Sequence, residues 1–305
     1  MVSCPLCGRG ELEVLVTREQ VAEEMELRRD FFAARMDGAL DAAEQKDRSD
    51  VAHGSTAAIL ICRACELLVR REDESPHFEE DAYAPFTMER MLRAHIEAYR
   101  RKEALYRPLL PAHAHVVEVG SYVGGFLHVA VEWGWTAVGV DVGHDTASFA
   151  RAHGYPTRNE SLEECAFTTE SFDGVFIWNC FEQLEDSHRV LREVQRILKP
   201  RGIAVIRTPN AAFYIECEKR RDERDAMTAL GHANLLGFPH LYGFTPASLT
   251  RLVAEHGFTS VQQIGDRHIT PALRPLNASA LREAERVEAA VPLPPWFELT
   301  MERRR

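Results

Sequence analysis

The sequence predicts an α/β fold in which a mainly parallel sheet carries helices on both faces. From residue 116 onward, short apolar runs alternate with segments whose apolar residues recur at helical spacing. A glycine-rich turn follows the first of these runs, and an acidic residue ends the second. We expect strands at 116–120, 137–141, 173–178 and 203–207, and helices at 124–133, 145–153 and 187–199.

Further elements flank this core on both sides. Residues 86–107 have apolar positions at helical spacing. Residues 244–258 predict another helix, with Thr245 as its N-cap, Pro246 in its first turn and Gly257 at its C-terminal end, and a late strand follows. The expected parts are an N-terminal cysteine module (1–72), a linker and helix (73–110), the α/β core (111–270) with an insertion at about 208–246, and a C-terminal extension (271–305).

Charge and hydropathy narrow the class of protein. The formal net charge is -11, from 36 Lys and Arg against 47 Asp and Glu. This argues against a nucleic-acid partner, because proteins that bind nucleic acids usually carry a basic surface. No apolar run approaches the length of a membrane span, and the first ten residues lack a signal-peptide core. We therefore expect a cytoplasmic protein without a membrane partner; the sequence indicates no oligomeric state.

Four of the seven cysteines form two C-x-x-C pairs, Cys4 with Cys7 and Cys62 with Cys65. Each pair can place two thiolates on one tetrahedral zinc ion. Gly8 suits the tight turn of a zinc knuckle, and apolar strand-like runs follow the first pair and precede the second. This layout predicts a zinc-ribbon-like module. Four unrelated thiols, or a redox-active pair, are the alternatives.

The gap between the two cysteine pairs is far wider than in an ordinary ribbon. Residues 18–46 account for it, because they read as an inserted amphipathic helix or helical pair. A site closed by four cysteines leaves no coordination position for a substrate, so the predicted zinc is structural rather than catalytic.

The glycine-rich turn after the first core strand is the expected ligand site. It lacks the Gly-Lys-Ser/Thr of a phosphate loop, and glycines at 120, 124 and 125 do not fit the GxGxxG fingerprint of dinucleotide-binding proteins. In open α/β sheets, however, ligands lie beyond the carboxyl ends of the strands. Gly120 and Gly124 allow a sharp turn and a close approach of backbone to ligand.

The acids beside this turn indicate the ligand's chemistry. Glu118 can attract an ammonium group, and the helix after the turn favours a carboxylate. Asp141, about 20 residues after Gly120, suits two ribose hydroxyls. S-adenosylmethionine has all three groups and no pyrophosphate, whereas NAD fits less well.

With these residues in place, the sequence resembles the class I S-adenosylmethionine-dependent methyltransferases over residues 111–265. Glu118-Val-Gly120-Ser-Tyr122-Val-Gly124 is similar to the family's E/D-x-G-x-G-x-G motif. "FDGVFIWNCFEQLED" (172–186) resembles a branch that has roughly FDvvxxWDvLEHLxD, and "LREVQRILKPRGIAVIRTPN" resembles its LREixRxLKPGGxLxixTPN. The resemblance implies a Rossmann-like fold with a seven-stranded sheet, and many bacterial members carry an N-terminal zinc ribbon.

The resemblance also assigns site residues. It implies that Glu118, Gly120 and Gly124 surround the methionine end of the cofactor, and that Asp141 holds the ribose. Further cofactor positions are Val142, Ser161 and Leu162 near the adenine, Asn179 at the fourth-strand tip, and Tyr122, which replaces the middle glycine and covers the cofactor or shapes the substrate mouth. Gln183 replaces a His that binds metal in some relatives, which puts a catalytic metal in doubt.

The catalytic candidates come from the insertion at 208–246, where such enzymes build a substrate lid. His240 and Tyr242 are the preferred catalytic pair, followed by His232 and Tyr214. The chain has 13 histidines, and the alternative for any one of them is a surface or structural role. Aromatic residues near the fourth-strand tip and in the lid are expected to form an apolar acceptor pocket, or simply to fill the core: Trp178, Phe181, Phe213, Tyr214, Phe238 and Tyr242.

Three functions remain open at this point. The first is a methyltransferase for a small-molecule acceptor with a structural zinc. The second is an RNA methyltransferase whose zinc module grips RNA, which the acidic charge balance and the lack of a basic, aromatic-rich stripe in 1–72 oppose. The third is a non-enzymatic binding protein that keeps the cofactor fold, which only Tyr122 supports.

Overall fold

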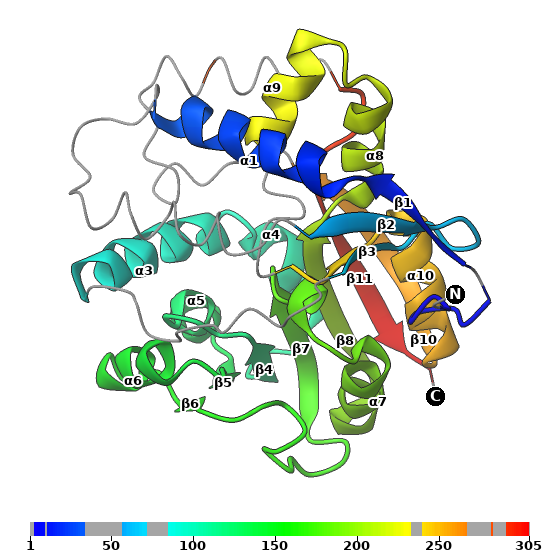
Figure 1. Ribbon diagram of the computed structural model, residues 1–305. Helices are drawn as coiled ribbons and strands as arrows, with labels where there is room; N and C mark the ends of the chain where they lie inside the picture. The colour runs from blue at the N-terminus through cyan, green and yellow to red at the C-terminus, as the bar shows by residue number, and fades with distance from the viewer. Residues whose placement is uncertain are drawn as a thin grey trace.

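Seven strands form the central sheet, in the order β10-β11-β8-β7-β4-β5-β6 (Figure 1). The computed structural model describes residues 3–9, 11–33, 57–71, 85–232, 240–266, 282 and 291–304. The strands of this sheet are β4 (His115–Val119), β5 (Thr136–Val140), β6 (Thr157–Arg158), β7 (Phe172–Trp178), β8 (Leu198–Pro209), β10 (Phe258–Asp266) and β11 (Trp296–Arg303). β4 to β8 pair in parallel, whereas β11 runs antiparallel to β8 and β10. The mainly parallel, seven-stranded α/β fold is therefore confirmed.

Helices cover both faces of this sheet because side chains alternate along each strand. On β7, Val175 and Ile177 pack into one core cluster, and Phe176 and Trp178 pack into another. The first cluster is completed by α7 and α10, and the second by α3 and α5. The helices of the core are α3 (Pro85–Arg100), α5 (Gly125–Glu132), α6 (His144–Ala152), α7 (Ser187–Ile197) and α10 (Pro246–Glu255).

The predicted core elements are present with small shifts at their ends. The helix expected at 86–107 is divided into α3, α4 (Glu103–Tyr106) and the 3-10 turn η1 (Arg107–Leu109). Helix α10 has the predicted start, because the Thr245 side chain accepts a hydrogen bond from the backbone N–H of Ser248 and Pro246 occupies the first turn. Among the described helices, none has the length and apolar character to cross a bilayer.

The C-terminal extension differs from its prediction. Strand β11 comes from the stretch that was placed outside the core, yet it lies inside the sheet between β8 and β10. Phe297, Leu299 and Met301 are buried on one face of it. Glu298 on the other face is also buried, where it accepts hydrogen bonds from Lys102 and Tyr106. This buried acid interrupts the apolar pattern by which sequence analysis recognises an inner strand.

The cysteine module is a small antiparallel sheet with a helical insertion. Strands β1 (Leu12–Val16), β2 (Ala58–Cys62) and β3 (Leu68–Arg71) pair in that order, and the expected strand-like runs on β1 and β2 are confirmed. Helix α1 (Arg18–Ala33) forms the first part of the predicted 18–46 insertion, whose remainder lies outside the described residues. The sheet gains a fourth strand, β9 (Tyr242–Gly243), from the lid segment.

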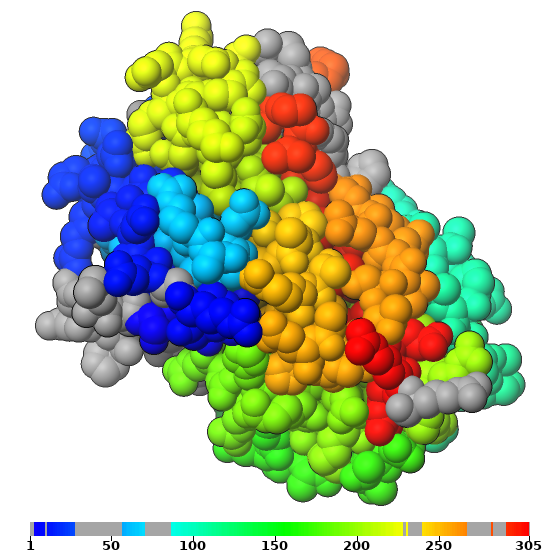
Figure 2. Space-filling view, turned by 90° about the vertical axis from the view of Figure 1, so that its right-hand side faces the viewer, coloured from blue at the N-terminus to red at the C-terminus, as the bar shows by residue number. Residues whose placement is uncertain are grey.

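Module, lid and core pack as one body. In Figures 1 and 2 the module (blue and light blue) lies against the yellow lid helices α8 (Ala211–Lys219) and α9 (Arg224–His232) and beside the golden α10. Tyr214 of α8 donates a hydrogen bond of 2.6 Å to Glu24 of α1, and Arg221 donates to the same carboxylate. Tyr214, one of the two lower-ranked catalytic candidates, is thus buried in this contact between lid and module.

Candidate active site

The glycine-rich turn after β4 has a left-handed backbone at all three positions of the motif. The φ angles are 71° at Gly120, 49° at Tyr122 and 82° at Gly124. A bulky residue rarely adopts this conformation, which explains why the resembled motif has glycine at each position. The Tyr122 hydroxyl donates to the sulfur of Met91 on α3 at 2.8 Å, and its ring lies 5.9 Å from that of His95. Tyr122 therefore turns toward α3.

Glu118 is buried at the carboxyl end of β4, with 2% of its surface exposed. Its Oε2 atom has no hydrogen bond from any residue that the structure describes, and nor has the Oγ atom of the neighbouring Ser121. Burial, together with the charge of Asp141, holds the pKa of Glu118 well above its ordinary value. A buried carboxylate oxygen without a donor is rare in native proteins and suits a cationic ligand.

Asp141 lies at the end of β5 and closes the turn. Its Oδ2 accepts from the backbone N–H of Tyr122 at 2.7 Å, and its Oδ1 accepts from Gly143 N at 2.9 Å and from the Thr146 hydroxyl at 2.8 Å. Burial nevertheless raises its pKa. Because a carboxylate has about four acceptor positions, these contacts leave about one for a ribose hydroxyl. Asp141 thus fixes the turn in addition to its predicted role.

The residues expected near the adenine have different surroundings. Val142, which follows Asp141, is 62% exposed. Asn159, which sequence analysis missed, donates to the carbonyls of Asp141 at 3.0 Å and Val142 at 2.9 Å and so holds this segment. Ser161 Oγ donates to Glu164, and Leu162 is buried in the core, so its side chain does not line an open surface.

Asn179 occupies the tip of β7, again with a left-handed φ of 54°. This conformation favours Asn over most residues. Its side-chain oxygen accepts from the guanidinium of Arg207 at the end of β8, and Arg207 also pairs with Asp266 at 3.0 Å. Arg207 is a site residue that the sequence did not reveal, because it follows an apolar run in a strand and has no local signal.

Helix α3 contributes a second group of unpredicted residues. His95 and Tyr99 lie on it with their rings 5.9 Å apart, and the Tyr99 ring is 5.4 Å from that of Trp178 on β7. Burial and the charge of Arg207 lower the pKa of His95 to about 4, so this imidazole is neutral at neutral pH. The segment that was read as a linker and leading helix therefore forms a wall beside the glycine-rich turn.

His240 lies in the interior, next to the 3-10 turn η2 (Phe181–Gln183) that follows β7. Its Nε2 atom is 3.5 Å from Oε1 of Glu182, and the two residues are 5% and 0% exposed. The backbone N–H of Leu241 donates to the Glu182 carbonyl at 2.9 Å. Glu182 directly precedes Gln183 and occupies the glutamate position of the resembled motif.

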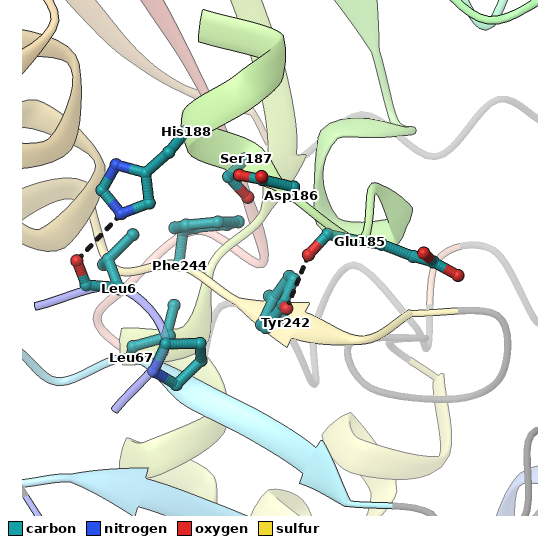
Figure 3. A pocket seen from close by; sticks show the side chains of 9 residues that line it. Leu6, Leu67, Glu185, Asp186, Ser187, His188, Tyr242 and Phe244 are labelled. Carbon is teal, nitrogen blue, oxygen red and sulfur yellow. Dashed lines mark hydrogen bonds between the residues drawn. The ribbon is translucent and has the colours of Figure 1, made fainter. Parts of the chain in front are cut away.

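Tyr242 is placed differently. Its hydroxyl donates to the backbone carbonyl of Glu185 at 3.0 Å, and its ring lines a small pocket between the first cysteine knuckle, the loop before α7 and β9 (Figure 3). On the opposite wall of this pocket, His188 Nε2 lies 3.0 Å from the carbonyl of Leu6 (Figure 3). Tyr242 therefore ties the lid strand to the core at the module, which is a structural contact.

The aromatic residues that were expected to line an acceptor pocket do not gather around one. Trp178, Phe181 and Phe213 are each at most 4% exposed and belong to three separate core clusters. Phe238 lies outside the described residues. The alternative, that the rings fill the core, holds for Trp178, Phe181, Phe213 and Tyr214, whereas Tyr242 is only partly buried and lines the small pocket of Figure 3.

The two cysteine pairs meet at one point. The sulfur atoms of Cys4, Cys7, Cys62 and Cys65 all lie within 4.8 Å of one another, with 3.6 Å between Cys4 and Cys65 and 3.7 Å between Cys7 and Cys62. Tetrahedral zinc with bonds of about 2.3 Å needs sulfur separations of about 3.8 Å. The donor set and its spacing therefore fit the ion.

Both cysteine pairs have the same local turn. Gly8 and Glu66, the residues after the second cysteine of each pair, have φ angles of 63° and 60°. The backbone N–H of each donates to the carbonyl of the first cysteine, at 2.9 Å from Gly8 to Cys4 and at 2.7 Å from Glu66 to Cys62. The two knuckles thus present their thiols in the same way. Gly8 was predicted in this role, and Glu66 was not.

Comparison with known proteins agrees with this geometry. The profile of the methyltransferase domain family matches residues 90–263, more than half of the chain. A protein from Mycolicibacterium smegmatis, whose name places it among the S-adenosylmethionine-dependent methyltransferases, is 27% identical over 225 residues, which cover 70% of this chain and 81% of that protein.

Two solved structures are similar to this chain to different degrees. A chain from the complex between the Haloferax volcanii Trm112 methyltransferase activator and a methyltransferase superposes with a TM-score of 0.54 at 18% identity, covering 76% of this chain and 100% of that one. An S-adenosylmethionine-dependent methyltransferase from Mesorhizobium loti has a TM-score of 0.49 at 19% identity, covering 66% of this chain and 97% of its own. At these identities the first likeness shows the fold alone.

Replacing Gly120 tests how tightly the turn is built. A Cβ there would lie 2.5 Å from Cys180 Sγ, whereas Gly154, with a similar φ of 84°, has open space around the same position. We expect Gly154→Ala to cost about 1–2 kcal/mol of unfolding free energy, from left-handed strain alone. Gly120→Ala should cost about 2–5 kcal/mol, because overpacking adds to the strain. Urea denaturation measures both, and equal losses would contradict a packed turn.

Proposed function

Because the chain belongs to the family of S-adenosylmethionine-dependent methyltransferase domains, we propose that it methylates a small-molecule acceptor, with His240 as general base and one structural zinc ion in the N-terminal module. The observation that carries the cofactor assignment is the buried carboxylate of Glu118, which lacks a donor at Oε2 and lies beside Asp141 under a left-handed turn.

Each part of the site has a role toward the cofactor. Glu118 receives the ammonium, and the backbone of Gly120 and Gly124 permits close approach of the methionine end. The remaining acceptor position of Asp141 takes a ribose hydroxyl, and Val142 offers an apolar surface to the adenine. Backbone near Ser161 and Leu162 borders the adenine edge, while Asn179, held by Arg207, borders the methionine end.

The cofactor supplies a methyl group already activated on a sulfonium, so the protein's task is to position the acceptor and exclude water. The buried His240 is our candidate for this task, because it comes from the lid segment and contacts Glu182 just beyond the tip of β7. Tyr242 keeps a structural role, since its hydroxyl is committed to the Glu185 carbonyl. An enclosed base favours a small acceptor over a nucleic-acid strand, as does the net charge of -11.

Release of S-adenosylhomocysteine from S-adenosylmethionine tests the acceptor class. We expect a library of hydroxylated small molecules to contain compounds that raise the release rate at least about tenfold, because a positioned base contributes rate only when its acceptor is bound. Total RNA should leave the rate at its background value. Transfer to RNA that weakens steeply with salt, with none to the library, would replace this proposal by the RNA alternative.

The zinc proposal gives a separate prediction. Purified protein should contain about one zinc ion per chain. Cys62→Ser should abolish zinc binding and lower the melting temperature, because metal binding and folding of the module are one process. Cys165→Ser is the matched control, since Cys165 is also a buried free thiol but lies outside the cluster. Metal-free protein with unchanged stability would remove the zinc.

A further inference from the structure

Glu182 is a buried acid in η2, the 3-10 turn that follows β7. It is 0% exposed, and neither of its carboxylate oxygens accepts a hydrogen bond from the described residues. Burial raises its pKa to about 7, although its own backbone N–H, the Thr208 hydroxyl and the charge of Arg207 act in the opposite direction. A buried acid in this state is energetically costly, and such groups occur mainly at functional sites.

The Thr208 hydroxyl on β8 and the imidazole of His240 both face this carboxylate, with 3.5 Å between Oε1 of Glu182 and Nε2 of His240. The distance is long for a hydrogen bond, as is common in catalytic pairs before ligands bind. The backbone keeps the two side chains together, because Leu241 N donates to the Glu182 carbonyl and Arg70 N on β3 donates to the Leu241 carbonyl at 3.0 Å. The segment is thus fixed to η2 on one side and to the module on the other.

The other charged and titratable groups around the pair come from three elements. Arg207 on β8 is held by Asn179 and Asp266, and Arg70 on β3 is buried. Cys180, at the start of η2, has its pKa raised by burial and by the charges of Glu182, Asp141 and Glu118. The same Cys180 lies against Gly120 of the glycine-rich turn, and Glu182 follows Cys180 by two residues. The Glu182–His240 pair is therefore close to this turn along the chain of contacts.

We propose that Glu182 is the positioning residue for His240, and that the acceptor is a compound methylated on a hydroxyl group. This inference rests on the proposed function. His240 keeps its Nε2–H toward Glu182, and Nδ1 takes the proton of the acceptor hydroxyl. The acceptor oxygen forms its bond to the methyl carbon as the carbon–sulfur bond breaks, and the electron pair of that bond stays on sulfur. The Glu182 carboxylate stabilises the imidazolium that results.

The hydroxyl class follows from what such a pair can supply. A neutral hydroxyl is a poor nucleophile near neutral pH, so it needs a base during transfer, whereas an uncharged amine attacks without one. A buried imidazole oriented by a buried carboxylate is an arrangement that activates hydroxyl groups. If the acceptor needed no base, the destabilising burial of Glu182 would have no functional explanation.

The titration of His240 tests the pair without knowledge of the acceptor. The full-length protein, labelled at histidine with carbon-13 and nitrogen-15 and saturated with S-adenosylhomocysteine, is titrated by NMR, and His240→Gln assigns the signal. Neutral His240 should carry its proton on Nε2. Glu182→Gln removes the negative charge beside the ring and should lower the pKa of His240 by about one unit or more.

Two controls make the outcome decisive. Glu185→Gln changes an exposed acid on the same loop and should leave the His240 pKa within about 0.3 units. If Glu182→Gln does not fold, the carboxyl signal of Glu182 in His240→Gln gives the reverse reading, and its pKa should rise. An unchanged His240 pKa in folded Glu182→Gln, or an unchanged Glu182 pKa in His240→Gln, would overturn the pairing. Failure of the wild type to bind S-adenosylhomocysteine by calorimetry would instead overturn the proposed function.

Discussion

The site depends on one electrostatic constraint: the Glu118 carboxylate is buried at the end of β4, without a donor at Oε2, beside the second buried acid Asp141. In this apolar interior, the charge of Asp141 adds to the cost of ionising Glu118. The fold tolerates Asp141 because the turn's own N–H groups and Thr146 donate to it. Glu118 has no such compensation among the described donors at that oxygen, so the site is built to receive a positive charge.

The second organising feature is the joining of module, lid and core through β9. This short strand extends the module sheet on β3, and the residue before it donates to the carbonyl of Glu182 at the tip of β7. The cysteine cluster, Phe244 and residues of α10 share one hydrophobic core. The module therefore packs directly against the segment that contains His240, and its four cysteines belong to the same core.

Sequence patterns were sufficient for the parts that depend on local chemistry. The spacing of apolar residues, which alternates between strand and helix periods, predicted the core strands and helices. The rule that ligands lie beyond the carboxyl ends of parallel strands pointed to the turn beside Glu118 and Asp141 as the ligand site. The patterns failed where distant segments meet. Strand β11 contains a buried glutamate that is stabilised by Lys102, Tyr106 and Arg207, all far away in the chain. Glu182 likewise meets His240 only in the folded chain. Tyr122 and Arg201 replace glycines of the resembled motifs, yet keep their left-handed φ angles.

Proton release on cofactor binding tests the central claim most directly. Burial and Asp141 raise the pKa of Glu118, and a bound ammonium should lower that pKa, so that binding releases protons from this carboxyl. Calorimetry with S-adenosylhomocysteine in two buffers of different ionisation enthalpy should show proton release in the wild type and none in Glu118→Gln. Binding of equal affinity and identical enthalpy in both buffers, with or without Glu118, would contradict the account.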